Sequence, residues 1–277
     1  MTLPNFLLVG AAKSGTTSLY GILRQHPEIF MPETKEPCFF VDWTGGIRNQ
    51  SEYEKLFSPG QDFPARGEAS TPYLFDAEAP AKIKALLPEV KILIILRNPA
   101  DMAFSLWRMM RRLGRHGEKL SFASALAEEE CRISDPKFSN GSSNYIGNFY
   151  YFHRGLYCQQ VKRYLELFGR DRVRVLLFEE FKKNPLVTVQ EIYRFLGVQE
   201  NFTPKIEKSN RGTEVRHRGL EKRLRGTSHL LGKILQKLNQ KPLPVMDPTL
   251  RQNLLEKFRP SIGELEKLLG KDLAVWG

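Results

Sequence analysis

Apolar residues follow two periods along this chain, and the two periods predict different elements. Continuous apolar runs predict buried strands, because a strand inside a parallel sheet is covered on both faces. Such runs cover residues 6–9, 29–31, 91–96 and 173–178, and a short segment of mixed polarity at residues 66–70 is predicted to be a fifth strand. Between them, apolar positions recur at helical spacing and predict helices over residues 18–24, 53–57, 79–87, 122–131, 157–168, 185–196 and 250–269, and one that begins after Pro99. Alternating strands and helices predict an α/β fold of three layers, with a central, mostly parallel sheet and helices on both faces.

The segments between these elements are predicted to be loops, apart from one basic stretch. Residues 134–147 are polar and turn-rich, and residues 205–217 form a basic loop. Residues 218–239 are predicted to be a very basic helical region whose apolar stripe packs on the core or faces a partner or a membrane. A length of 277 residues suits one large α/β domain or two small ones. We expect a single domain over residues 1–277.

Composition places the chain among ordinary globular proteins. Hydrophobic residues make up 41% and charged residues 26%, and no apolar run approaches the roughly 20 residues that a membrane span needs. The first strand begins so close to Met1 that a signal peptide has no room. We therefore expect a cytoplasmic chain, or a catalytic domain trimmed out of a longer protein. The three cysteines lack paired spacing, which favours reduced thiols over a disulfide framework or a zinc site.

The net charge of +11 predicts an anionic partner without naming it. Nucleic acid, a membrane surface, an anionic cofactor and an acidic substrate all fit. The basic region from residue 211 onward has no aromatic residue except His217 and His229 that could stack on bases, which disfavours nucleic acid. The five histidines show no metal-binding spacing, so we expect no metal site.

The segment that follows the first strand has the features of a phosphate-binding loop. It reads Gly10-Ala-Ala-Lys-Ser-Gly-Thr-Thr-Ser18 and lies between a predicted strand and a predicted helix. Backbone N–H groups at a helix N-terminus, together with the helix dipole, favour an anion there. Lys13 adds a full positive charge, and hydroxyl donors come from Thr16, Thr17 and Ser18.

This loop differs from the Walker A loop of kinases and other NTPases. Gly10 and Gly15 fit the G-x-x-x-x-G frame, but Lys followed by Ser or Thr should come next. Here the lysine stands before Gly15, as Lys13, and no strand end carries a clear acid for Mg²⁺. The sequence therefore predicts a phosphate site without an obvious metal, and a P-loop kinase or NTPase is the competing enzyme class.

The same loop resembles the 5′-phosphosulfate loop of sulfotransferases that use 3′-phosphoadenylyl sulfate (PAPS), and the resemblance covers nearly the whole chain. The segment Leu96-Arg-Asn-Pro99 through Ser105 is similar to the family's 3′-phosphate segment, and Arg97 and Ser105 are the matching residues. A guanidinium suits this role because it binds phosphate through bidentate hydrogen bonds. The resemblance implies a P-loop-like fold and nucleotide contacts from Lys13, Ser14, Gly15, Thr16, Thr17, Ser18, Arg97 and Ser105.

A second segment, Thr34-Lys-Glu-Pro-Cys-Phe-Phe40, resembles the Lys-Glu-Pro-x-Phe-Phe sequence of the heparan-sulfate-type branch, in which the glutamate is the general base. The resemblance implies that Glu36 takes the proton that the acceptor loses as it attacks sulfur. It also implies that Lys35 and Lys13 stabilise charge on the leaving phosphate oxygen and the sulfuryl group. Cys38 stands where the carbohydrate enzymes often carry histidine, so their sugar specificity is not implied.

Several further candidates follow from the same resemblance. A Gly-Glu-x-Ser-x-x-Tyr pattern places Glu68 and Tyr73 either at the acceptor site or in support of the Glu36 loop. Asp42 either contacts the acceptor or is a solvated loop acid. The family's basic loop, which closes over the nucleotide, is matched loosely by Arg211, Gly212, Arg216 and Arg218.

The resemblance implies an enzyme, a PAPS-dependent sulfotransferase. It moves the sulfuryl group from PAPS to a hydroxyl or amine of an acceptor and releases adenosine 3′,5′-bisphosphate (PAP). The acceptor is a glycan or a small natural product, and the basic surface slightly favours an anionic one. The competing classes are a P-loop kinase or NTPase and a basic protein that binds nucleic acid or membranes.

Overall fold

The computed structural model describes residues 2–43, 45–113, 116–140, 144–206, 214–215, 240–241 and 244–277. The chain divides into two compact units, one made of Met1–Ile206 with Thr249–Gly277 and the other of Glu207–Pro248. In the smaller unit, β6 (Glu214–Val215) pairs antiparallel with β7 (Gln240–Lys241). The larger unit contains all the elements described below.

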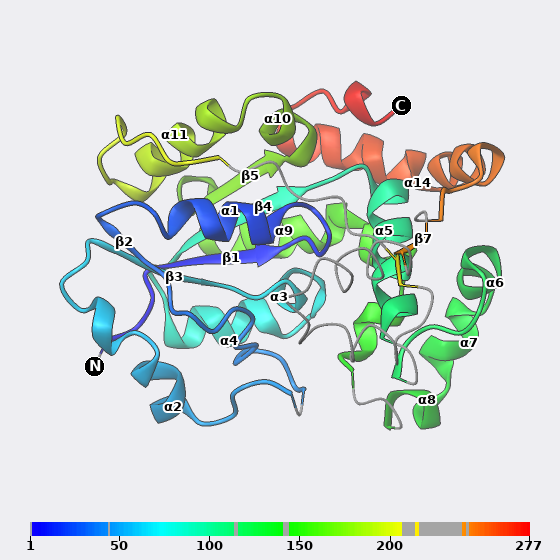
Figure 1. Ribbon diagram of the computed structural model, residues 1–277, viewed down its shortest axis with the longest axis horizontal. Coiled ribbons are helices and arrows are strands. Elements are labelled where there is room, and N and C mark those ends of the chain that lie inside the picture. Colours follow the sequence, from blue (N-terminus) through cyan, green and yellow to red (C-terminus); the bar gives the residue numbers. More distant parts are fainter. Residues whose placement is uncertain are drawn as a thin grey trace, which may run out of the picture. The chain divides into compact units, whose positions relative to one another are not determined.

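A five-stranded parallel sheet forms the centre of the larger unit, as the apolar runs predict (Figure 1). The strand order is β2-β3-β1-β4-β5, so β1 lies in the middle with β3 and β4 beside it. Phe6 pairs with Gly67 on one side and with Lys91 on the other. The strands are β1 (Phe6–Gly10), β2 (Ile29–Phe30), β3 (Ala65–Ala69), β4 (Lys91–Leu96) and β5 (Val173–Leu177).

Helices cover both faces of this sheet, which confirms the three-layer prediction (Figure 1). On one face α1 (Thr16–Leu23) packs with α10 (Phe178–Lys183) and α11 (Pro185–Leu196), and their buried residues share one core with Phe6 and Leu93. On the other face lie α3 (Pro72–Phe75), α4 (Ala79–Leu86) and α9 (Tyr157–Phe168). Both faces of β1 and β4 are therefore buried, as their unbroken apolar sequences require.

The remaining helices extend from this core. They are α2 (Gln50–Lys55), α5 (Pro99–Arg112), α6 (Phe122–Ala127), α7 (Glu129–Ser134), α8 (Pro136–Asn140) and α14 (Pro248–Leu269). Short 3₁₀ turns are η1 (Ser58–Gly60), η3 (Ile146–Phe149), η4 (His153–Gly155), η5 (Arg170–Arg172) and η6 (Ala274–Trp276). Asn98 begins α5 by accepting hydrogen bonds from the backbone N–H groups of Ala100 and Asp101.

The predicted helix over residues 122–131 is wrong in one respect, because it is two helices that meet at Glu128. No glycine or proline marks this break. The chain turns there so that buried Glu129 accepts hydrogen bonds of 2.8 Å from the backbone N–H groups of Phe152 and His153. A tertiary contact thus overrides the local helical pattern.

Three other local predictions need correction. The expected loop at 134–147 contains α8, and the loop expected between residues 70 and 79 contains the short helix α3. The expected loop at 205–217 contains the two residues of β6. The basic helix predicted over residues 218–239 lies outside the described residues.

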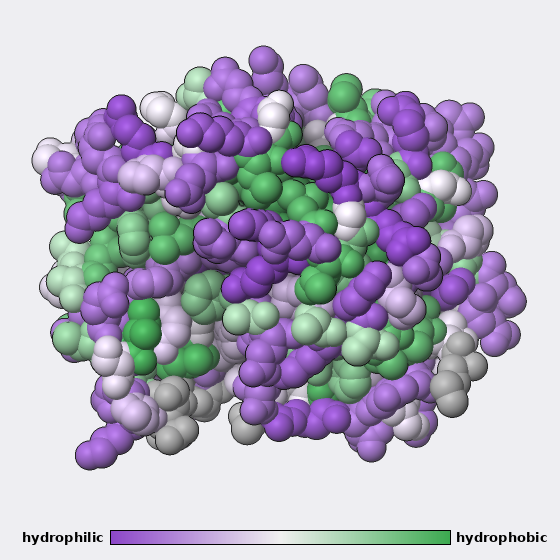
Figure 2. Space-filling model, turned by 180° about the vertical axis from the view of Figure 1, so that it is seen from behind, coloured by the Kyte–Doolittle hydropathy of each residue, from purple (hydrophilic) through white to green (hydrophobic). Residues whose placement is uncertain are grey.

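On the face shown in Figure 2, hydrophilic side chains cover much of the surface and apolar side chains lie between them. Among the exposed apolar residues are Val187 on α11 and Val275 on η6. Within the described residues, no helix is both long enough and apolar enough to cross a bilayer.

Candidate functional site

The loop after β1 presents unpaired backbone donors at the start of α1. Gly15 caps this helix in the left-handed region, with φ 89°, and the N–H groups of the first helical turn have no partner within the helix. A Cβ on Gly15 would lie 2.8 Å from the ring of Phe178, so a larger residue has no space there. Lys13 also has a positive φ, 61°, inside this loop. The loop is therefore shaped to receive an anion at a helix N-terminus.

The strand order brings two other segments beside this loop. Because β3 and β4 flank β1 in parallel, the residues that follow all three strands meet at one edge of the sheet. After β4, Arg97 Nη1 donates a hydrogen bond of 3.0 Å to the backbone oxygen of Lys13. The Arg97 guanidinium also lies over the ring of Phe178, 5.0 Å from its centre. The two predicted phosphate-binding residues are thus joined directly.

One face of α5 adds two arginines to the positive charges of Lys13 and Arg97. Ser105, Arg108 and Arg112 follow one another at intervals of three and four residues, so they share a helix face. Burial lowers the pKa of Lys13, and the charges of Arg112, Arg97 and Arg108 lower it further. The Arg108 Nε is buried and has no hydrogen-bond partner in the described part of the chain.

Arg108 and Arg112 were not among the residues predicted from the sequence. Their signal is their spacing: they lie three and seven residues after Ser105, on a helix that begins with the phosphate-binding segment. Within the described residues, the carboxylates form no ion pair with Lys13, Arg97, Arg108 or Arg112. Four neighbouring cations that form no ion pair with a carboxylate of the described residues are a strong site for a multiply charged anion.

The Glu36 loop lies beside β3, across from these cations. The Glu36 N–H donates to the backbone oxygen of Ala69 at 3.0 Å, which ties the loop to the end of that strand. The Glu36 carboxylate accepts hydrogen bonds of 3.0 Å from Lys35 Nζ and from Thr71 Oγ1. Its side chain remains 39% exposed, so it is accessible to an acceptor. The negative charge of Glu36 also raises the pKa of Lys13, opposing the effect of burial, so the two groups are neighbours.

The buried carboxyl group of Glu68 supports the Glu36 loop through Ser70. Glu68 is 1% exposed and accepts hydrogen bonds from the hydroxyls of Tyr73 at 2.7 Å, Ser70 at 2.7 Å and Tyr53 at 3.2 Å. Ser70 in turn accepts the backbone N–H of Cys38 at 3.0 Å. Burial raises the pKa of Glu68 to about 7, although the three hydrogen bonds oppose this shift. Glu68 and Tyr73 are both fully covered, which is the geometry of a support for the Glu36 loop.

Arg154 is a buried residue beside the Glu36 loop. It is 3% exposed and donates to the backbone oxygen of Thr71 at 3.1 Å and to Asn148 Oδ1 at 2.9 Å. Burial lowers the pKa of Arg154, whereas the nearby charge of Glu36 raises it. Arg154 is therefore a buried residue that holds Thr71 in place, and Thr71 in turn donates a hydrogen bond to Glu36.

The other predicted residues are distributed as follows. Asp42 is exposed and pairs with Arg48 at 2.7 Å, as a solvated loop acid would. In the loop, Ser14 and Thr16 are buried, whereas Thr17 is exposed. The described residues contain no cluster of three His, Cys, Asp or Glu side chains that could hold a metal ion. The basic-loop candidates Arg211, Gly212, Arg216 and Arg218 lie outside the described residues.

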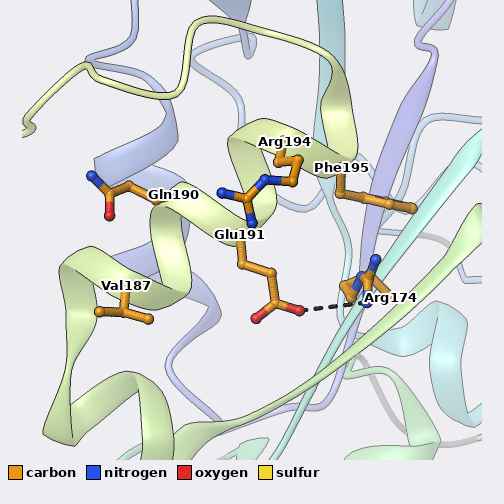
Figure 3. Close-up of a pocket in the computed structure, with 6 residues that line it drawn as sticks. All are labelled: Arg174, Val187, Gln190, Glu191, Arg194 and Phe195. Atoms are coloured by element: carbon orange, nitrogen blue, oxygen red, sulfur yellow. Dashed lines mark ion pairs between the residues drawn. The ribbon is translucent and has the colours of Figure 1, made fainter.

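A pocket of about 500 Å³ lies elsewhere, on α11 and the adjacent strand β5 (Figure 3). Figure 3 shows Glu191 extending toward Arg174, with which it forms an ion pair of 3.5 Å. None of the predicted site residues lines this pocket. The candidate site is therefore the edge of the sheet that carries Lys13, Arg97 and Glu36.

A family model described as a sulfotransferase domain matches residues 3–216, which include all three of these segments. The chain belongs to the sulfotransferase family. This confirms the resemblance inferred from the phosphate-binding loop and the Lys-Glu-Pro segment, and it identifies the protein as an enzyme of the transferase class.

Similar sulfotransferases include one of known structure from Alicyclobacillus acidocaldarius. It is 36% identical, covers 100% of this chain and 99% of its own, and superposes with a TM-score of 0.79. The structure of mouse sulfotransferase SULT7A1 complexed with PAP is 22% identical over 72% of this chain and 60% of its own, with a TM-score of 0.50, and it shares the fold.

A curated relative is the bifunctional heparan sulfate N-deacetylase/N-sulfotransferase 2 of Bos taurus. It is 29% identical over 97% of this chain. The sulfotransferase described here spans 30% of the length of that relative.

Proposed function

We propose that this sulfotransferase moves the sulfuryl group of PAPS to a hydroxyl or amine of an acceptor and releases PAP. The observation that carries the proposal is the hydrogen bond between Arg97 and Lys13, which joins two anion-binding elements at one edge of the sheet. PAPS carries a phosphosulfate at one end and a 3′-phosphate at the other, so it needs two such elements. Mouse SULT7A1, which shares the fold, has a structure in complex with PAP, and this supports PAPS as the donor.

The loop after β1 is assigned to the phosphosulfate. Its backbone N–H groups and Lys13 would bind the 5′-phosphate and the sulfuryl oxygens, and its hydroxyl residues would add donors. Arg97 and Ser105 are assigned to the 3′-phosphate, because both lie on the segment that begins at the end of β4. We retain Arg211, Gly212, Arg216 and Arg218 as proposed further contacts to this phosphate.

Glu36 is assigned as the general base. The acceptor oxygen or nitrogen forms a bond to sulfur while its proton passes to the Glu36 carboxylate. The bond between sulfur and the bridging phosphate oxygen breaks on the opposite side, and PAP leaves with the electron pair. Lys13 and Lys35 stabilise the charge that grows on the leaving oxygen and the sulfuryl group. Thr71 and Lys35 hold the carboxylate through their hydrogen bonds to it.

The acceptor is proposed to be a glycan, and preferably an anionic one. The name of the bovine relative includes heparan sulfate N-sulfotransferase, which supports a glycan amine as one candidate. Arg108 and Arg112 extend the cationic surface along α5 beyond Arg97 and Ser105, where an acidic group on the acceptor would be bound. A hydroxyl on a small natural product is the second candidate.

A binding titration tests the choice of donor. PAP should bind tightly with EDTA present, and ATP should bind more weakly whether or not Mg²⁺ is added. Tighter binding of ATP that requires Mg²⁺ would identify a kinase or NTPase instead. Transfer from labelled PAPS to a panel of neutral and anionic glycans, and to small alcohols and amines, then identifies the acceptor.

A further inference from the structure

We propose that Trp276 is a positioning residue for the nucleotide, because it holds the segment that carries Arg97. Trp276 lies in η6, one residue before the end of this chain, and it is 1% exposed. It reaches Arg97 through Glu179 and Asn98. This inference rests on the assignment of Arg97 to the 3′-phosphate, and it adds a residue far from that site in the sequence.

Glu179 joins the two segments through both of its carboxylate oxygens. Its Oε1 accepts the backbone N–H of Asn98 at 3.0 Å, and its Oε2 accepts the indole N–H of Trp276 at 3.0 Å. The Asn98 side chain closes the ring, since its Nδ2 donates to the backbone oxygen of Trp276 at 2.6 Å. Three groups, from the turn between β4 and α5, from α10 and from η6, are thereby fixed relative to one another.

Asn98 has no freedom left in this arrangement. Its Oδ1 accepts the N–H groups of Ala100 at 3.0 Å and Asp101 at 3.2 Å, while its Nδ2 is bound to Trp276. The residue is 2% exposed. The peptide that connects Arg97 to α5 is therefore fixed on both sides, and the direction in which the Arg97 side chain leaves the strand is set with it.

The residue before Glu179 strengthens the same connection. Phe178 lies under the Arg97 guanidinium and against Gly15 of the phosphosulfate loop. A shift of Glu179 would move Phe178, and with it the surface on which Arg97 and the loop both rest. On the other side, the Trp276 ring lies 6.0 Å from that of Tyr157, whose buried hydroxyl has no hydrogen-bond partner in the described part of the chain.

Glu179 follows an apolar strand, where a Walker B acid would stand in an NTPase. Its two carboxylate oxygens accept hydrogen bonds from Asn98 and Trp276, so its role here is to bind groups of the protein itself. This gives a physical reason for a carboxylate at that position in a chain without a Walker A lysine.

Two variants and one control test the inference. Trp276→Phe keeps an aromatic ring but removes the indole N–H, and Glu179→Gln removes one of the two acceptors. Val275→Ala alters the neighbouring residue of η6, which is 56% exposed and makes no contact in this network. Hydrogen exchange over residues 97–104 measures the network in the free protein. Calorimetry with PAP and steady-state kinetics measure its consequence.

Both test variants should exchange the Asn98 amide faster than the wild type, because its bond to Glu179 is loosened. The Kd for PAP and the KM for PAPS should rise about tenfold, which equals the loss of roughly 1.4 kcal/mol of binding energy. The KM for the acceptor and kcat should stay within about twofold, a split that a general loss of stability would not produce. Val275→Ala should match the wild type in every measurement.

Unchanged exchange at Asn98, or unchanged PAP affinity in both test variants, would overturn the inference. Equal losses in PAPS and acceptor KM, shared by Val275→Ala, would overturn it too, since they indicate a purely structural role. If the wild type itself fails to bind PAP, the proposed function is wrong. The exchange measurement in the free protein still decides whether Trp276 holds the Arg97 segment.

Discussion

The guanidinium of Arg97 donates a hydrogen bond to the backbone oxygen of Lys13 at 3.0 Å. The residue that follows β4 therefore helps to set the shape of the loop that follows β1. A nucleotide bound at one of these elements depends on the other, since the bond would break if either segment moved. The predictions below follow from this pairing and from the groups around it.

Replacing Arg97 by lysine keeps a positive charge but removes the planar fork. Arg97→Lys loses the bond to the Lys13 backbone and bidentate binding of the phosphate. We expect the Kd for PAP to rise about 10- to 100-fold, which corresponds to roughly 1.5–3 kcal/mol for one charge-assisted interaction. Isothermal calorimetry measures the change. Arg174→Lys, on β5, is the matched control, and a wild-type affinity in Arg97→Lys would contradict the assignment.

The lowered pKa of Lys13 predicts an alkaline limit to activity. Burial is the largest cause, and Arg112 is the largest of the charge effects. Because only the charged lysine can stabilise the phosphosulfate, kcat/KM for PAPS should fall at a pH below the ordinary lysine value of 10.5. Arg112→Gln should move this limb to higher pH, because it removes a repelling charge. A limb at the same pH in both proteins would show that Lys13 does not control it.

Glu36→Gln should remove the base and leave the nucleotide site in place. General base catalysis contributes about 10²–10⁴-fold, so kcat should fall by that factor. PAP affinity should remain within about twofold of wild type, since the hydrogen bonds of the Glu36 carboxylate go to Lys35 and Thr71 and not to Lys13, Arg97 or Ser105. Glu33→Gln alters an exposed acid of the same loop and serves as the control. A large loss of PAP affinity in Glu36→Gln would count against its role as base.

The buried carboxyl of Glu68 predicts that stability depends on pH. Burial raises its pKa to about 7 in the folded protein, above the ordinary value of 4.5, so the folded state holds this proton more tightly than the unfolded state. The contribution is greatest below about pH 4.5 and is lost as the pH rises through 7, by roughly 3 kcal/mol in total.

Glu68→Gln should remove this dependence, because its amide is neutral at every pH. Urea unfolding at pH 5 and pH 8 measures it. The difference in unfolding free energy between variant and wild type should grow in favour of the variant as the pH rises. Glu166→Gln, an exposed acid on α9, should follow the wild-type curve. Parallel curves for Glu68→Gln and wild type would show that Glu68 is ionised throughout.

The arginines of α5 predict a preference for acidic acceptors. Arg108→Ala should raise the KM for an anionic glycan about tenfold, while the KM for a neutral acceptor should change little. Arg111→Ala removes the same charge from the next turn of the helix, where Arg111 donates to the backbone oxygen of Lys119, and it is the control. If the KM for PAPS rises instead, Arg108 belongs to the nucleotide site.

The sheet could be predicted from the sequence because its strands are continuous apolar runs. The run from Lys91 to Leu96 has the same bounds in the structure. The adjacency of Arg97 and Lys13 required only that β1 and β4 be neighbours, which the resemblance to the family implies. The break at Glu128 could not be predicted, since its cause is a contact between Glu129 and backbone groups more than 20 residues away.

The less visible parts of the site depend on such long-range contacts. Trp276 is one apolar residue near the end of the chain, and no local pattern connects it with Asn98. Arg108 and Arg112 are part of no motif in the sequence. Their shared face with Ser105 could have been found by placing the whole of α5 on a helical wheel. Glu68 and Tyr73 match a pattern, but only their burial distinguishes a support from an acceptor contact.

The strand order has a consequence for how the protein reaches its native state. Phe6 pairs with Gly67 and Lys91, so the central strand meets its neighbours only after two long stretches of chain have closed. Contacts of such high sequence separation form slowly, because closing each stretch costs entropy before the contact is made. The anion site is complete only when the three strands are aligned, because its residues follow those strands. A nucleotide that binds this site would therefore stabilise the assembled sheet by mass action.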